Sequence, residues 1–375
     1  TVPRSGGATG AVDDDRASNQ RQAYAPVNLL RAALVPVLAV VLAITVGAII
    51  IELSGLNAFE AYRALYDGAL ADRKGIGRTL EKATPLVMGG LAVAFAFKAG
   101  LFNIGGQGQL VIGALFAGAI GYGVTGLPWI IHIPLALLVG AIGGALWGMI
   151  AGVLKATRGA HEVITTIMLN FVALNLTDWL TSKVWREPGV IVRTPAIETS
   201  AEIPRWDQLP TGFALSVAAA IACWYLLERT TFGFEIRSVG LNPEAARYAG
   251  ISVSRIVILT MAISGMLAAL GGAIETQGVV GRYEPGFNAG LGFNGITIAL
   301  LARTHPLGVI PAALLIGAME AGSSMMQFKA DVDPEITEII EALMLLFVAT
   351  PILVKWVLRR RESSDISVGA HWGDA

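Results

Sequence analysis

The chain has 375 residues, of which 54% are hydrophobic and only 15% are charged. Soluble globular domains carry roughly 25% charged residues, so this composition excludes an ordinary water-soluble enzyme and indicates an all-α polytopic membrane protein. The formal net charge of -1 argues against nucleic acid as a partner, since phosphate binding requires a concentrated positive field.

Ten stretches are apolar enough to be predicted as membrane-spanning helices, each of which needs about 20 apolar residues. They lie at residues 32–52, 83–99, 106–124, 128–154, 162–183, 211–227, 254–275, 290–304, 306–326 and 335–357. The third and the eighth are short and rich in glycine, so each is expected to be either a full helix or a broken one that its neighbours bury.

An even number of spans places both termini on one side of the membrane. The basic residues of the shorter loops favour the cytoplasm for that side. Residues 1–31 are expected to form a disordered cytoplasmic tail, and residues 358–375 a second cytoplasmic tail, around a transmembrane domain at 32–357.

Two longer segments are predicted to lie outside. Residues 57–71 have apolar side chains at near-helical spacing, which predicts a short amphipathic helix along the membrane surface. Residues 184–210 contain four prolines together with Trp185 and Trp206, which predicts an ordered, irregular loop with interfacial tryptophans. Both segments are open to a plainer interpretation as connectors.

Small residues recur at four-residue steps in the fourth span, at Gly140, Gly144, Gly148 and Gly152. This spacing puts them on one helix face, where they allow another helix backbone to approach closely, so we predict a packing seam. A weaker seam of the same kind is predicted in the seventh span, at Ser264, Ala268 and Gly272.

The sequence lacks the motifs of nucleotide binding and of metal or disulfide chemistry. The G-x-G-x-x-G match at Gly290 has no predicted strand before it, and no phosphate-binding loop of the form G-x-x-x-x-G-K-[ST] occurs, so ATP would have to bind another chain. The single cysteine, Cys223, excludes an internal disulfide framework, and the four histidines lack metal-ligand spacing.

An internal repeat is the next feature. Residues 102–117 align without gaps to residues 287–302, with Phe, Asn and Gly shared at the start of each copy. In the predicted topology the two copies enter the membrane from opposite sides, as an inverted repeat requires, and transporters built in this way place their pathway between the repeats.

Amide side chains within the spans are the candidate lining of a translocation pathway for a neutral polar solute, because amides in a bilayer either bond a neighbouring helix or face a polar cavity. The candidates are Asn103, Gln107, Gln109, Asn170, Asn288 and Asn294. Hydrogen bonding between helices remains the alternative for each of them. Asp178, Glu320 and Glu341 are carboxylates within the spans that a proton-coupled carrier would use.

The segment between the sixth and seventh spans contains a short predicted helix. Asn242 suits an N-cap, Pro243 the first helical position and Gly250 a stop. Two helical turns are too short to be stable alone in water, so a partner is expected to dock against them.

These residues carry a family resemblance. Gly240, Glu244, Ala245, Ala246 and Gly250 resemble the EAA-type coupling loop of ABC importer permeases, in the branch that carries branched-chain amino acids, ribose and nucleosides. Residues 83–110, with their N-I-G-x-x-G-Q segment at Asn103, and residues 159–171 resemble the nucleoside-type permeases of that branch. The resemblance extends over roughly residues 50–355.

The resemblance implies the ten-helix type II importer architecture, with a permease domain at 32–357 and a cytoplasmic coupling loop at 228–255. It implies a second homologous permease subunit, a cytoplasmic ATPase that binds ATP and Mg in place of this chain, a substrate-binding lipoprotein or periplasmic protein, and location in the inner membrane. The residues expected to contact the ATPase are Gly240, Asn242, Glu244, Ala245, Ala246, Arg247, Tyr248 and Gly250.

The leading functional prediction is therefore an importer permease for a nucleoside, not an enzyme. A simple-sugar permease is the alternative within the class, since both solutes are neutral and carry hydroxyls. A proton-coupled secondary transporter is the alternative from another class, and a scaffold without transport would leave the paired amides unexplained.

Overall fold

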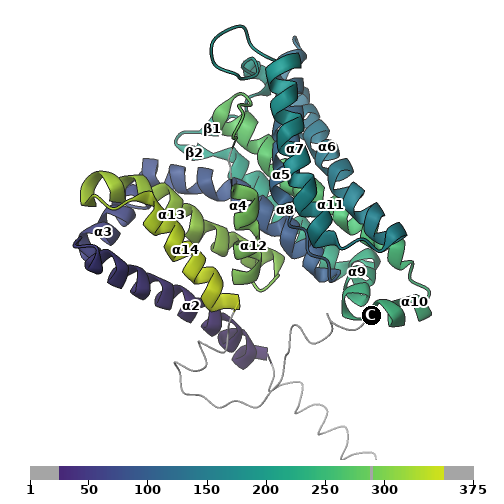
Figure 1. Cartoon of the computed structure of the whole chain (residues 1–375), viewed down its shortest axis with the longest axis horizontal. Coiled ribbons are helices and arrows are strands. Elements are labelled where there is room, and N and C mark those ends of the chain that lie inside the picture. Colours follow the sequence, from purple (N-terminus) through teal and green to yellow (C-terminus); the bar gives the residue numbers. More distant parts are fainter. Residues whose placement is uncertain (1–24, 288–289, 350–375) are drawn as a thin grey trace, which may run out of the picture.

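The computed structural model describes residues 25–287 and 290–349, and this part of the chain is mostly helical (Figure 1). The expected C-terminal tail, residues 1–24 of the expected N-terminal tail and Asn288 lie outside it. The helices are α2 (Ala25–Leu53), α3 (Ala58–Ala69), α4 (Arg73–Lys98), α5 (Gly106–Gly123), α6 (Trp129–Arg158), α7 (Glu162–Trp179), α8 (Thr211–Arg229), α9 (Thr231–Leu241), α10 (Pro243–Tyr248), α11 (Val253–Glu275), α12 (Leu291–Leu301), α13 (Val309–Ala330) and α14 (Pro334–Ala349).

Shorter elements connect these helices. Five-residue π-helical turns, η1 (Leu180–Val184) and η3 (Thr276–Val280), extend the ends of α7 and α11. The 3-10 turns are η2 (Thr199–Ala201) and η4 (Pro306–Gly308). Strands β1 (Arg205–Trp206) and β2 (Leu209–Pro210) form a small antiparallel hairpin.

Each of the ten predicted spans overlaps a helix, although residues 350–357 of the tenth lie outside the described residues. Six helical segments of the described residues are long and apolar enough to cross a membrane. These six are Arg73–Lys98, Trp129–Arg158, Glu162–Val184, Thr211–Arg229, Val253–Val280 and Pro306–Ala330. The chain is thus a helical multi-pass membrane protein. Helix α2 already begins at Ala25, so the last residues of the expected N-terminal tail are helical.

The two glycine-rich spans differ from each other. Helix α5 has 18 residues, whereas α12 has 11, which at 1.5 Å per residue covers only about half of a 30 Å hydrocarbon layer. The eighth predicted span is therefore the short, broken form of the two that the sequence left open.

The helices form two groups joined by α4. Helix α11 packs against α6, α5 and α4, while α13 packs against α4 and α3, and α14 against α2. Figure 1 shows α5, α6, α7, α8 and α11 in one half of the molecule and α2, α3, α13 and α14 in the other. The middle of α4 is buried from Ala83 to Ala96, because helices cover it on all sides.

The predicted glycine seam of α6 is confirmed. A Cβ added at Gly144 would collide with the Ala269 side chain and would lie 2.6 Å from the Gly265 carbonyl oxygen on α11. A Cβ at Gly148 would lie 2.5 Å from the Met261 carbonyl oxygen. The two helices therefore touch backbone to backbone, which only small residues allow.

The loop at 184–210 is ordered, as predicted. The backbone N–H groups of Thr194, Ile197 and Ile203 donate to carbonyl oxygens of Tyr283, Gly281 and Gln277 at 2.9–3.0 Å. The two predicted interfacial tryptophans differ, since Trp206 is 80% exposed while Trp185 packs edge-on against Phe116. The loop thus forms a cover over the end of α11.

The predicted amphipathic helix at 57–71 is α3. Its buried side carries small residues, among them Ala61 and Ala64, whereas Phe59 is exposed. Small residues let α3 lie close to α13, where Gly322 faces Leu65.

We predict that Gly144→Ala lowers the stability of the protein by about 1–3 kcal/mol, because the added methyl overpacks the contact between α6 and α11. Gly123→Ala is the matched control, since a Cβ there would meet nothing within 4 Å. The measurement is the midpoint of thermal denaturation in detergent, and equal midpoints for the two variants would contradict the prediction.

Candidate functional site

The start of α5 is held by a network of buried polar side chains centred on Asn103. The Asn103 amide nitrogen donates to Gln109 Oε1 at 2.8 Å and to Ser264 Oγ at 2.7 Å, and its Oδ1 accepts from the Gly105 N–H at 2.9 Å. Ser264 Oγ in turn donates to the Ala92 carbonyl oxygen at 2.6 Å. The network therefore connects the loop before α5 to α11 and α4.

Asn170 of α7 holds the same start from another side. Its Oδ1 accepts from the Gly108 N–H at 2.8 Å, and its Nδ2 donates to the Ile104 carbonyl oxygen at 2.9 Å. The N–H groups in the first turn of a helix have no acceptor inside the helix. Asn170 supplies an acceptor for one of them, the N–H of Gly108, from a neighbouring helix.

Gln107 connects the two copies of the internal repeat. Its Oε1 accepts from the N–H of Gly292, in the first turn of α12, at 2.8 Å. A Cβ added at Gly106 would lie 3.0 Å from the Gly292 carbonyl oxygen, so the first turns of α5 and α12 touch. The two copies of the repeat thus place the N-terminal turns of α5 and α12 against each other.

The predicted pathway amides thus fall into two environments. Asn103, Gln107, Gln109 and Asn170 are 1–3% exposed and have hydrogen-bond partners within the protein. Asn294 instead borders an open groove, and its Nδ2 donates to Glu320 Oε1 at 3.2 Å.

This groove has a volume of about 830 Å³ and lies between α12, α13 and α14, with Lys82 of α4 at one side. The polar residues that line it are Lys82, Asn294, Thr297, Glu320, Ser323, Ser324, Thr337, Glu338 and Glu341. Glu320 and Glu341, two of the carboxylates considered for a proton-coupled carrier, face this groove, whereas Asp178 is exposed on α7. Thr337 and Glu338 were not among the predicted pathway residues, although Thr337 and Glu341 lie one turn apart on one helix, which was a usable signal.

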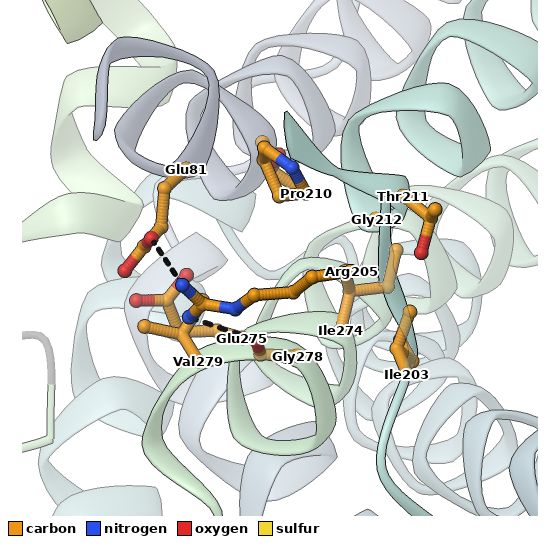
Figure 2. A pocket seen from close by; sticks show the side chains of 11 residues that line it. Glu81, Ile203, Arg205, Pro210, Thr211, Gly212, Ile274, Glu275, Gly278 and Val279 are labelled. Atoms are coloured by element: carbon orange, nitrogen blue, oxygen red, sulfur yellow. Dashed lines mark hydrogen bonds and ion pairs between the residues drawn. The ribbon is translucent and has the colours of Figure 1, made fainter. Parts of the chain in front are cut away.

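Arg205 forms a polar connection between the β1–β2 hairpin and the helices (Figure 2). Its guanidinium lies 3.5 Å from Glu81 Oε2 of α4 and donates to the Gly278 carbonyl oxygen of η3 at 3.3 Å. Figure 2 shows the Arg205 side chain extended between Glu81 and Glu275. The hollow beside it measures about 10 Å³, enough for one water molecule, so this cluster joins the hairpin to the helices and is no solute site.

The predicted short helix after α9 is confirmed as α10. Asn242 Oδ1 accepts from the Ala245 N–H at 3.0 Å, as an N-cap does, and Gly250 has φ +84°, which favours glycine. Glu244 pairs with Arg247 at 3.0 Å, and both are about two-thirds exposed. Ala246 is buried, whereas the Tyr248 side chain is 92% exposed.

Gly240, at the end of α9, connects this segment to the start of α5. A Cβ at Gly240 would collide with the Lys98 carbonyl oxygen and would lie 3.0 Å from the Gly100 nitrogen. The chain between Lys98 and Asn103 is thus held at one end by α9 and at the other by the amide network.

Comparison with known proteins decides the family. The family described as "Branched-chain amino acid transport system / permease component" matches residues 75–349, well over half of the chain. The chain belongs to this permease family.

Several relatives carry guanosine or nucleoside names, and two of them align over most of this chain. The permease is 38% identical over 343 residues to the guanosine ABC transporter permease protein NupP of Bacillus subtilis, covering 88% of this chain and 97% of NupP. It is 33% identical over 353 residues to the nucleoside ABC transporter permease protein NupB of Lactococcus lactis, covering 91% and 97%.

A third relative carries a sugar name. The glucose ABC transporter permease protein TsgB13 of Haloferax volcanii is 33% identical over 358 residues, covering 91% of this permease and 94% of TsgB13. No solved structure matches the chain.

We predict that Asn103→Ala destabilises the permease by about 1–3 kcal/mol, because it leaves the Gly105 N–H, Gln109 and Ser264 without their buried partner. Asn175→Ala is the control, since Asn175 is exposed and its Nδ2 donates to the carbonyl oxygen of Phe171 in its own helix. Denaturation midpoints in detergent measure the difference, and an Asn103→Ala midpoint equal to that of the control would refute the role of the network.

Proposed function

We propose that this chain is the permease subunit of an ATP-binding cassette importer and forms the translocation pathway for a nucleoside. The observation that carries the proposal is the 38% identity, over nearly the whole chain, to a permease named for guanosine. Family membership alone would leave the solute open, because the family description names branched-chain amino acids.

The exposed helix α10 is proposed to dock on a cytoplasmic ATPase, which binds ATP and Mg. Asn242, Glu244, Ala245, Arg247, Tyr248 and Gly250 would form the contact, with Gly240 and Ala246 holding the helix to the permease. A short capped helix with an exposed Tyr248 suits insertion into a groove of a partner. Movement of α10 would then reach the start of α5 through Gly240 and Lys98.

The arrangement in the membrane is proposed from the same features. The described chain begins at α2 and ends at α14 on the side where α9 and α10 lie (Figure 1). In this proposal the short helix α12 would cross the membrane together with the chain next to it, which makes ten crossings. Both termini would then be cytoplasmic, and the protein would lie in the inner membrane. A second homologous permease and a substrate-binding lipoprotein or periplasmic protein would complete the importer.

Two alternatives have an observation in their favour. The glucose name of one relative favours a simple-sugar permease. The carboxylates of the groove, Glu320 and Glu341, favour a proton-coupled carrier, which would work without ATP.

The deciding experiment is uptake by proteoliposomes that contain the complete importer. We expect ATP-dependent uptake of labelled guanosine or uridine and none of labelled ribose or glucose. Uptake of a sugar alone would favour the sugar permease, and uptake driven by a proton gradient without ATP would refute the importer.

In the same assay, Glu244→Arg and Gly250→Val are expected to lower uptake about tenfold while ATP hydrolysis continues. The physical reason is that these variants weaken the contact that couples the ATPase to the permease, and such couplings are typically worth about 5–150-fold. Glu202→Arg is the control, an exposed acid of the loop at 184–210. Wild-type uptake by both α10 variants would contradict the coupling role.

The topology is testable because Cys223 is the only cysteine and is buried. In a Cys223→Ser background, we expect Trp206→Cys to react with a membrane-impermeant maleimide in intact cells. Tyr248→Cys is expected to react only after the membrane is opened. The reverse pattern would invert the proposed orientation.

A further inference from the structure

We propose that the groove between α12, α13 and α14 is a binding station for the transported solute, and that it accepts an uncharged nucleoside and rejects the phosphorylated form. This inference rests on the proposed function and deepens it by assigning residues to solute recognition. The volume of about 830 Å³ lies within the range of roughly 300–1,000 Å³ that small-molecule sites occupy.

The charges of the groove determine which solutes it excludes. Three carboxylates, Glu320, Glu338 and Glu341, face one ammonium group, Lys82. A phosphate group carries negative charge, and Lys82 is the single cationic side chain of this lining, so a phosphate group would be disfavoured. Among the described residues, no group of three acidic, histidine or cysteine side chains is placed to hold a metal ion, so the carboxylates are not arranged as a cation site.

The same side chains determine which solutes the groove attracts. A carboxyl oxygen accepts hydrogen bonds, and a nucleoside offers ribose hydroxyls and base N–H groups as donors. Asn294 donates to Glu320, which orients that carboxylate. Phe293 is 44% exposed and lines the groove, so it offers an aromatic face on which a base can stack.

Thr337 gives independent support for a polar ligand in the groove. Thr337 is 3% exposed, and its Oγ1 has no hydrogen-bond partner among the described residues. A buried hydroxyl without a partner costs free energy, and Thr337 lines this groove. A hydroxyl-bearing solute would satisfy it.

The experiment measures binding of tritiated guanosine and uridine to the complete importer in detergent. The nucleoside to be measured is the one that the wild type takes up. Glu341→Gln and Thr337→Val are each expected to raise its dissociation constant about tenfold, a change of about 1.4 kcal/mol. Glu335→Gln is the matched control, because Glu335 lies on the same helix, is exposed and does not line the groove. It is expected to bind as the wild type does.

A second measurement tests exclusion of anions. Guanosine 5′-monophosphate and uridine 5′-monophosphate are expected not to compete with the nucleoside on the wild type. Glu338 lies at the exposed edge of the groove. Glu338→Lys is expected to lower the inhibition constant of the matching monophosphate at least about tenfold relative to the wild type, because the new ammonium group attracts the phosphate.

The outcomes separate this inference from the proposed function. Normal nucleoside uptake together with wild-type binding by Glu341→Gln and Thr337→Val would overturn the binding station and leave the permease assignment intact. Absence of nucleoside uptake by the wild type would overturn both. Loss of subunit assembly in these variants, seen by size-exclusion chromatography, would show that the groove is a subunit interface and would also overturn the station.

Discussion

The structure depends on one constraint, which is that a helix starting inside a packed membrane protein must find partners for its first N–H groups within the protein. Helices α5 and α12 both start in this way and touch at their first turns. Asn170 supplies a partner for α5 from α7, and Gln107 supplies one for α12 from α5. These amides serve backbone groups, which explains why polar side chains persist in an apolar chain.

The same contacts connect α9, which precedes α10, with the groove. Gly240 at the end of α9 lies on Lys98 and Gly100, a short way before Asn103. Asn103 fixes the start of α5, and Gln107 joins α5 to α12, which forms one wall of the groove. Displacement of α10 by a partner would thus reach the groove through packed backbone and buried hydrogen bonds, both of which transmit strain well.

Close helix contacts give this path its stiffness. Glycines on α6 allow backbone contact with α11, and α11 in turn contributes Ser264 to the amide network. Helix α4 packs against both halves of the molecule, so the same helix accepts the hydrogen bond from Ser264 and contacts α13.

Much of this could be predicted from local patterns. The seam from Gly140 to Gly152, the cap of α10 by Asn242 and the positions of most helices were predicted correctly, because periodicity and capping depend on residues a few positions apart. Helix α9 was not predicted. The environment of the amides could not be predicted in the same way. Gln109 and Asn294 occupy aligned positions of the repeat, yet Gln109 is buried in a network whereas Asn294 lines a groove.

The sequence by itself therefore determined a helical membrane permease and the position of its short exposed helix. Only the tertiary structure decided which polar groups meet, since Asn103 bonds Ser264 across 161 positions and Gln107 bonds Gly292 across 185. The physical reason is that the rotation and depth of each helix decide whether an amide faces a neighbour or an open groove, and these are set by packing between distant segments.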